Sequence, residues 1–254
     1  MTNQPKNSQN STEKQSIQSN IDQHSKQQFE NMVNEGLRSG GLHIISDKGH
    51  GKTRLLFSIA DYCRNLENSR VFIFDGSDSW LYGFSQIPTF NINSEDITAK
   101  QTRYSIETEH YSLNNFELVK LALANHQDLL FRLKTRNPSK RGFFIRSVIN
   151  HLDAQQRQEI EESATNTPKN QLCYFIEEAQ DVFNNRSTMR QDSEEFLSVF
   201  NEARNNRETF FTASQRLSDF SKTIRTKQTY LIGKINIEDI NHKFTESKNS
   251  IIST

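Results

Sequence analysis

The stretch Ser46-Asp47-Lys48-Gly49-His50-Gly51-Lys52-Thr53 decides the fold of this chain. A short apolar segment, residues 41–45, precedes it, and residues 54–63 follow with apolar side chains at helical spacing. A strand, a glycine-containing loop and a helix, in that order, are the context of a phosphate-binding loop. The two glycines let consecutive backbone N–H groups face the phosphates, and the helix adds the positive end of its dipole. The sequence therefore predicts a site for a nucleoside triphosphate.

The candidate ligands of ATP and Mg²⁺ lie within and just after this loop. We expect the ammonium of Lys52 to reach the β- and γ-phosphates and the hydroxyl of Thr53 to ligate Mg²⁺. Ser46 stands where the full motif has its first glycine, and its small side chain makes it a tolerated variant. The alternative is a glycine-rich turn with a surface lysine. The full set of predicted nucleotide-binding residues is Asp47, Lys48, Gly49, His50, Gly51, Lys52, Thr53 and Arg54.

A second candidate element is the apolar segment 172–176, which ends in the adjacent carboxylates Glu177 and Glu178. Successive side chains leave a strand end in different directions, so two adjacent acids can do different work. We expect Glu177 to hold Mg²⁺ and Glu178 to orient and polarise the water that attacks the γ-phosphate. Acids also favour helix N-termini for electrostatic reasons alone, and the upstream phosphate loop favours the catalytic interpretation.

A third element ends in an amide. Residues 209–215 are predicted to form a strand that closes with Gln215, and an amide beside the γ-phosphate can sense it and position the attacking water. The alternative is a surface glutamine at a strand end. Lys52 and Glu177 lie 125 positions apart with at least one further strand between them. This spacing suits the RecA/ASCE-like class of P-loop NTPases, in which a strand is inserted between the phosphate loop and the acidic strand.

Strands alternate with helices along the chain, which predicts an α/β fold with a parallel sheet covered by helices on both faces. Ligands of such sheets bind at the carboxyl ends of the strands, where the polar candidates fall. Residues 84–110 are expected to be irregular, apart from a weak strand at 104–107. The predicted strands are 41–45, 71–75, 128–134, 172–176, 209–215 and 229–233, and the predicted helices are 27–38, 54–63, 113–125, 139–162, 193–205 and 218–225.

Composition bounds the class of protein. The 254 residues carry 31 basic and 31 acidic side chains, so net charge indicates no nucleic-acid partner and any such contact must be local. The two cysteines, Cys63 and Cys173, lack metal-ligand spacing and are expected to be buried reduced thiols. No apolar run is long enough to span a membrane, and we expect a cytoplasmic protein.

Both ends of the chain differ in composition from the rest. Asn, Gln and Ser fill 16 of the first 28 positions, and such a segment cannot bury enough surface to offset its ordering entropy. We therefore expect a disordered tail over residues 1–28, a P-loop ATPase domain over 29–245 and a flexible C-terminal tail over 246–254.

Together, the phosphate loop, the strand leading to Glu177-Glu178-Ala179-Gln180 and the run Ser214-Gln215-Arg216-Leu217-Ser218-Asp219 resemble the HerA/FtsK superfamily of DNA-translocating and DNA-packaging ATPases. Glu177 departs from the aspartate usual in that family but preserves the charge. The resemblance implies a ring of identical subunits, a hexamer in many members, whose sites are completed by an arginine of the neighbouring subunit. The candidates are Arg204, which we prefer, and Arg207; the alternative is that both are solvated cations at a helix end.

DNA contacts are predicted where cations cluster. No acidic residue occurs between Leu129 and Leu152, a stretch that contains Arg132, Lys134, Arg136, Lys140, Arg141 and Arg146. Such a cluster gives salt-dependent binding without sequence preference, although charge runs are more often solvated faces. A weaker second run comprises Arg216, Lys222, Arg225 and Lys227.

The sequence thus favours an ATPase that couples hydrolysis to DNA translocation or packaging, of the mobile-element or viral type. Two alternatives share the nucleotide site. One is an AAA+-like or signalling ATPase that acts on protein partners, and the other is a nucleotide-binding module that has lost activity. An ATPase assay with and without duplex DNA, at two salt concentrations, separates these three functions.

Overall fold

The computed structural model describes residues 9–76, 80, 87–93, 108–112, 116–135, 137–163, 167–183, 196, 198–215, 229–232 and 251–253. The chain divides into two compact units, residues 1–35 and 36–254. The first unit contains most of the helix α1 (Gln9–Ser39). The second contains the sheet and the remaining described elements.

The second unit is built on one parallel sheet. Its strand order is β4-β3-β5-β2-β6-β7-β1-β8-β9, and every strand pair in the described residues is parallel. The strands are β1 (Gly41–Ile45), β2 (Ser69–Asp75), β3 (Thr89–Asn93), β4 (Thr108–Ser112), β5 (Leu129–Leu133), β6 (Gln171–Ile176), β7 (Glu208–Ser214), β8 (Thr229–Ile232) and β9 (Ile251–Ser253). Strand β7 lies between β1 and β6, as the spacing of the motifs predicted.

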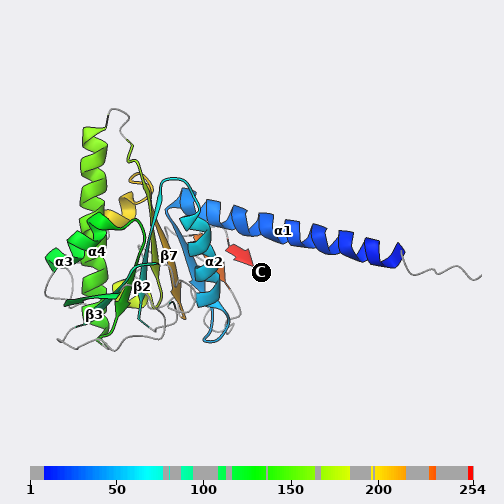
Figure 1. Cartoon of the computed structure of the whole chain (residues 1–254), viewed down its shortest axis with the longest axis horizontal. Helices are drawn as coiled ribbons and strands as arrows, with labels where there is room; N and C mark the ends of the chain where they lie inside the picture. The colour runs from blue at the N-terminus through cyan, green and yellow to red at the C-terminus, as the bar shows by residue number, and fades with distance from the viewer. Residues whose placement is uncertain are drawn as a thin grey trace, which may run out of the picture. The chain divides into compact units, whose positions relative to one another are not determined.

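Helices cover both faces of this sheet, so the predicted α/β fold class is confirmed (Figure 1). Helix α2 (Lys52–Arg64) packs on one face, and α3 (Phe116–Asn125), α4 (Pro138–Glu162) and the short α5 (Gln180–Phe183) pack on the other. Alternate residues of the central strands serve the two faces. In β6, Tyr174 joins the core under α4, whereas Phe175 contacts Trp80 and Phe211 on the α2 side.

The start of α4 follows directly from its sequence. The side chain of Asn137 accepts hydrogen bonds from the backbone N–H groups of Ser139 and Lys140, at 3.0 and 3.3 Å, which is the usual role of an N-cap asparagine. Pro138 follows in the first helical position, where its missing N–H costs no hydrogen bond. These two residues fix where the cations of the first turn of α4 lie.

Several elements differ from the predicted ones. Helix α1 begins at Gln9, well before the predicted start at residue 27, because Gln, Glu and Lys sustain a helix by local propensity without an apolar stripe. Strand β3 lies in a stretch expected to be irregular; its two asparagines hid it, since Asn is rare in strands. Strand β9 lies within the expected C-terminal tail and pairs with β8. The domain boundaries themselves stay predictions.

Some predicted features lie outside the described residues. These are the weak strand at 104–107, the helix at 218–225, residues 193–195 and 197 of the helix at 193–205, and the cations Arg136, Arg216, Lys222, Arg225 and Lys227. Within the part of the chain that the structure does describe, no helix combines the length and the apolar character that crossing a bilayer requires.

Candidate active site

The neighbouring parallel strands β1, β6 and β7 have their C-terminal ends on the same side of the sheet. We call this side, where the strands end, the carboxyl edge. Their ends are joined by backbone hydrogen bonds. The N–H of Ser46, just after β1, donates to the carbonyl of Ser214 at 3.4 Å, and the N–H of Ala179, just after β6, donates to the carbonyl of Ala213 at 3.0 Å. The end of β7 therefore fixes the phosphate loop relative to the turn that carries Glu177 and Glu178, which we call the acidic turn.

The phosphate loop depends on glycine for its backbone conformation. Gly49 and Gly51 have φ values of 83° and 82°, in the left-handed region that other residues rarely adopt. A Cβ atom added at either position would meet no atom within 4 Å, so conformation, not space, requires glycine here. Gly51 is the N-cap of α2 and, being glycine, has no side chain that could cap the helix. The N–H groups of the first turn of α2 are therefore left to a ligand, as anion binding requires.

Lys52 lies across its own loop. Its ammonium donates to the carbonyls of Ser46 and Asp47, at 2.6 and 2.9 Å. Burial lowers the pKa of Lys52, and the charges of Glu178, Glu177 and Asp47 oppose that shift. The cation is thus held at the mouth of the loop, in the field of both predicted carboxylates, where phosphate oxygens can replace the two carbonyls.

Glu177 and Thr53 meet at the start of α2. The hydroxyl of Thr53 donates a hydrogen bond to Oε1 of Glu177, although 124 positions separate them. A hydroxyl and a carboxylate are the hard oxygen ligands that Mg²⁺ prefers, and Mg²⁺ is usually held by one or two protein groups together with phosphates and water. The pair therefore fits the predicted ion. In the described residues no group of three or more His, Cys, Asp and Glu side chains forms a metal site.

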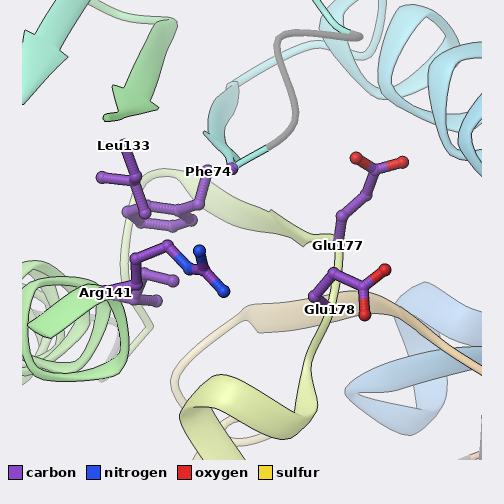
Figure 2. Close-up of a pocket in the computed structure, with 7 residues that line it drawn as sticks. Phe74, Leu133, Arg141, Glu177 and Glu178 are labelled. Atoms are coloured by element: carbon purple, nitrogen blue, oxygen red, sulfur yellow. The ribbon is translucent and has the colours of Figure 1, made fainter. Parts of the chain in front are cut away.

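Glu178 lies beside Glu177 but points elsewhere. Its φ of 51° places it in the left-handed region, which is uncommon for a residue with a Cβ atom. Figure 2 shows the two carboxylates directed away from each other. Oε2 of Glu178 accepts a hydrogen bond from Nε2 of Gln180, the first residue of α5. The two acids therefore have separate partners: Thr53 for Glu177 and Gln180 for Glu178.

A cavity of about 60 Å³ adjoins the two acids. Its walls come from the ends of β2 and β5, the turn after β6 and the start of α4. In Figure 2 the guanidinium of Arg141 points from α4 into this space, toward the strand end that carries the acids. Arg141 also donates to the carbonyl of Thr135 at 3.3 Å. The lining residues are Phe74, Gly76, Leu133, Arg141, Ile145, Glu177 and Glu178.

The remaining predicted site residues lie apart from this group. Gln215 is exposed and directly follows β7, so its backbone lies at the carboxyl edge between the loop and the acidic turn. Arg204 is exposed at the opposite edge, where its backbone N would lie 3.3 Å from a Cβ added to Gly40. Arg207 donates to the carbonyl of Pro168 at 3.2 Å within its own chain. Neither arginine contributes to the nucleotide site of its own chain.

The predicted DNA-binding cluster is split by the fold. Arg132, 9% exposed in an interior strand, donates to Asn91 at 3.3 Å, and Arg146, 4% exposed on α4, donates to the carbonyl of Val182 at 3.2 Å. These two predictions are wrong, because both side chains are buried. Arg141 faces the cavity. Lys134 and Lys140 are exposed.

Two residues at the site escaped the sequence analysis. Gln180 was noted only as part of a motif, and Arg141 was assigned to DNA. The signal for Gln180 was its place two positions after Glu178, within reach of that carboxylate. For Arg141 the signal was helical spacing, because Arg141 and Ile145 are one turn apart and both line the cavity.

A buried histidine joins the strands behind the loop. Nδ1 of His43 lies 2.5 Å from the hydroxyl of Thr212, and Nε2 lies 2.9 Å from the hydroxyl of Ser214. Burial lowers the pKa of His43 from 6.5 to about 3, so the ring is neutral near neutral pH. His43 thereby ties β1 to the last residues of β7, next to Gln215.

Comparisons with known proteins find structural likeness only. No protein-family model matches the sequence, and none of the curated proteins does. The genome packaging NTPase B204 from Sulfolobus turreted icosahedral virus 2, in complex with ATP-gammaS, is 10% identical with a TM-score of 0.44, over 80% of this chain and 78% of that one. EssC (ATPases 2 and 3) from Geobacillus thermodenitrificans is 10% identical with a TM-score of 0.45, over 85% of this chain and 36% of that one. The N-terminal domain of zonular occludens toxin from Neisseria meningitidis is 16% identical with a TM-score of 0.32, over 78% of each chain. These are distant likenesses, and the strand order with the loop between β1 and α2 is what assigns this chain the P-loop NTPase fold.

Proposed function

We propose that this chain is an ATPase that couples ATP hydrolysis to the translocation or packaging of DNA. One observation carries the hydrolytic part: Lys52, Thr53, Glu177 and Glu178 converge at the carboxyl edge, with a cation and two separately held carboxylates around a glycine loop. That set contains a group for each task in phosphoryl transfer.

The proposed chemistry is in-line attack of water on the γ-phosphorus. The water oxygen forms the new bond to phosphorus, the bond to the bridging oxygen breaks, and ADP leaves with the electron pair. One proton of the water passes to Glu178. Lys52 stabilises the negative charge on the β- and γ-oxygens. Thr53 and Glu177 would hold Mg²⁺, which neutralises phosphate charge when bound. Gln215, which directly follows β7, would sense the γ-phosphate.

The DNA part of the proposal has two supports. The motifs resemble those of the HerA/FtsK superfamily, and two exposed lysines lie near the cavity: Lys134 directly follows β5, and Lys140 is in the first turn of α4. The resemblance implies a ring, a hexamer in many members. In such a ring, Arg204 of a neighbouring subunit would be the arginine that completes the nucleotide site. Arg141 offers a cation in cis.

The test is ATP hydrolysis by the purified full chain with and without duplex DNA, at low and high salt, with Lys52→Ala as the inactive control. We expect Mg²⁺-dependent hydrolysis that DNA stimulates and salt suppresses. Hydrolysis indifferent to DNA would leave an ATPase that acts on another partner. Nucleotide binding without hydrolysis would leave a binding module.

A further inference from the structure

Gln180 lies at the carboxyl edge with its amide only half used. Its Nε2 donates to Oε2 of Glu178. A carboxylate without its proton can only accept, so the amide nitrogen must face Glu178 and the amide oxygen must face away. That oxygen, Oε1, is buried and has no hydrogen-bond partner among the described protein groups. Buried polar atoms are nearly always paired, so an unpaired Oε1 shows that the amide is held in this orientation by its bond to Glu178.

The backbone around Gln180 is fixed at several points. The left-handed φ of Glu178 turns the chain sharply after β6. The next N–H, that of Ala179, donates to the carbonyl of Ala213 on β7 at 3.0 Å. The N–H groups of Val182 and Phe183 then donate to the carbonyl of Ala179, at 3.1 and 3.0 Å. The backbone of Gln180 is therefore held relative to both β6 and β7, as the backbone of a group that orients a catalytic carboxylate must be.

We propose that Gln180 is a positioning residue for the hydrolytic step. Its Nε2 holds one oxygen of Glu178, which leaves Oε1 of Glu178 to take the proton of the attacking water. Its own Oε1 is enclosed by protein, so the amide acts through Glu178 and not on the water itself. Gln180 gains and loses no proton itself. This inference rests on the proposed ATPase function and adds a group that orients the catalytic carboxylate.

The first experiment compares Gln180→Leu with the wild type in steady-state ATP hydrolysis. Leucine fills nearly the same volume but can neither donate nor accept. We expect kcat to fall by about 10- to 100-fold, the size expected for a misoriented reacting group, with KM and nucleotide affinity unchanged. Gln180→Asn keeps the amide on a shorter stem and should recover part of the loss. Gln156→Leu is the matched control, since Gln156 is a buried amide that binds only the carbonyls of Asn170 and Asn206.

A double-mutant cycle with Glu178→Gln shows whether Gln180 acts through Glu178. In that background Gln180→Leu should cost little further activity, because the group that it orients has already gone. Wild-type kcat in Gln180→Leu, a rise in KM without a fall in kcat, or an additive loss in the double variant would each overturn the inference. If the wild type hydrolyses ATP no faster than Lys52→Ala, the proposed function fails instead. If Gln180→Leu does not fold, Gln180→Asn in the same cycle gives the answer.

Discussion

The two edges of the sheet use the same kinds of side chain for different ends. At the carboxyl edge, Lys52, Glu177 and Glu178 are only partly buried, and their partners are atoms that phosphate, Mg²⁺ or water can replace. At the other edge, which we call the amino edge, Asp153 and Glu208 are 5% and 0% exposed. Burial and the permanence of the partners, rather than residue type, separate a reactive carboxylate from a structural one.

At the amino edge, buried acids bond to other side chains. Asp153 accepts from Asn206 at 2.8 Å and from Arg157 at 2.7 Å, and Arg157 also binds Glu202 at 2.8 Å. Glu208 accepts from the hydroxyl of Tyr174 at 2.7 Å. Each of these acids bonds to at least one other side chain of the same chain, although Oε2 of Glu208 is buried without a partner. The network joins α4 to the start of β7 and leaves the chemistry to the other edge.

The sharpest test of this contrast is the same substitution at both edges. Glu178→Gln should lower kcat by about 10²- to 10⁴-fold, the usual contribution of a positioned base, while ATP binding is retained. Glu208→Gln should leave kcat within about twofold, because Glu208 lies at the other end of β7. Steady-state ATPase kinetics and a fluorescent-nucleotide titration measure both. Wild-type turnover in Glu178→Gln would remove that residue from the mechanism.

The reverse experiment removes a carboxylate from the amino edge. Asp153→Ala leaves the amide of Asn206 and the guanidinium of Arg157 without their buried acceptor, and we expect a loss of about 2 to 4 kcal/mol in unfolding free energy. The kcat of the molecules that remain folded should not change. Glu202→Ala is the control: its pair with Arg157 is largely exposed and contributes about 1 kcal/mol or less. Urea unfolding measures both, and equal losses would contradict the assignment.

Glu208 also predicts a pH dependence. Burial raises its pKa from 4.5 to about 8, against the opposing hydrogen bond from Tyr174. The folded chain therefore holds a proton that the unfolded chain releases above about pH 4.5. The contribution of Glu208 to stability is full below that pH and falls by about 1.4 kcal/mol per pH unit until about pH 8. From about pH 6 to about pH 7.5, the wild type should lose up to about 2 kcal/mol more than Glu208→Gln. Parallel curves in urea unfolding would mean that Glu208 is ionised in the fold.

The sequence predicted the carboxyl edge better than it predicted the surface around it, for a physical reason. The loop that holds Lys52 is a contiguous stretch whose geometry is set by two glycines, and the acids follow a strand that no solvent reaches. A run of cations has no such constraint. The sequence shows only that these cations are close along the chain. In β5, successive side chains point to opposite faces of the sheet, and in α4 they rotate by about 100° per residue around the helix axis. Arg132 was therefore directed inward and Arg141 toward the cavity, and neither could be separated from Lys140 by charge alone.

The smallest expected effect concerns the cations that remain on the surface. Lys134→Ala with Lys140→Ala should weaken duplex DNA binding by a few-fold and lower the slope of log affinity against log salt by about 0.9 for each phosphate that is no longer neutralised. ATP hydrolysis without DNA should not change, because neither lysine lines the catalytic cavity. Lys169→Ala removes an exposed lysine just before β6, at the amino edge, and serves as the matched control. Anisotropy titrations at several salt concentrations measure the slopes. If Lys169→Ala lowers the slope by half as much as the double variant does, DNA binds the two edges alike, and the carboxyl edge keeps only its catalytic role.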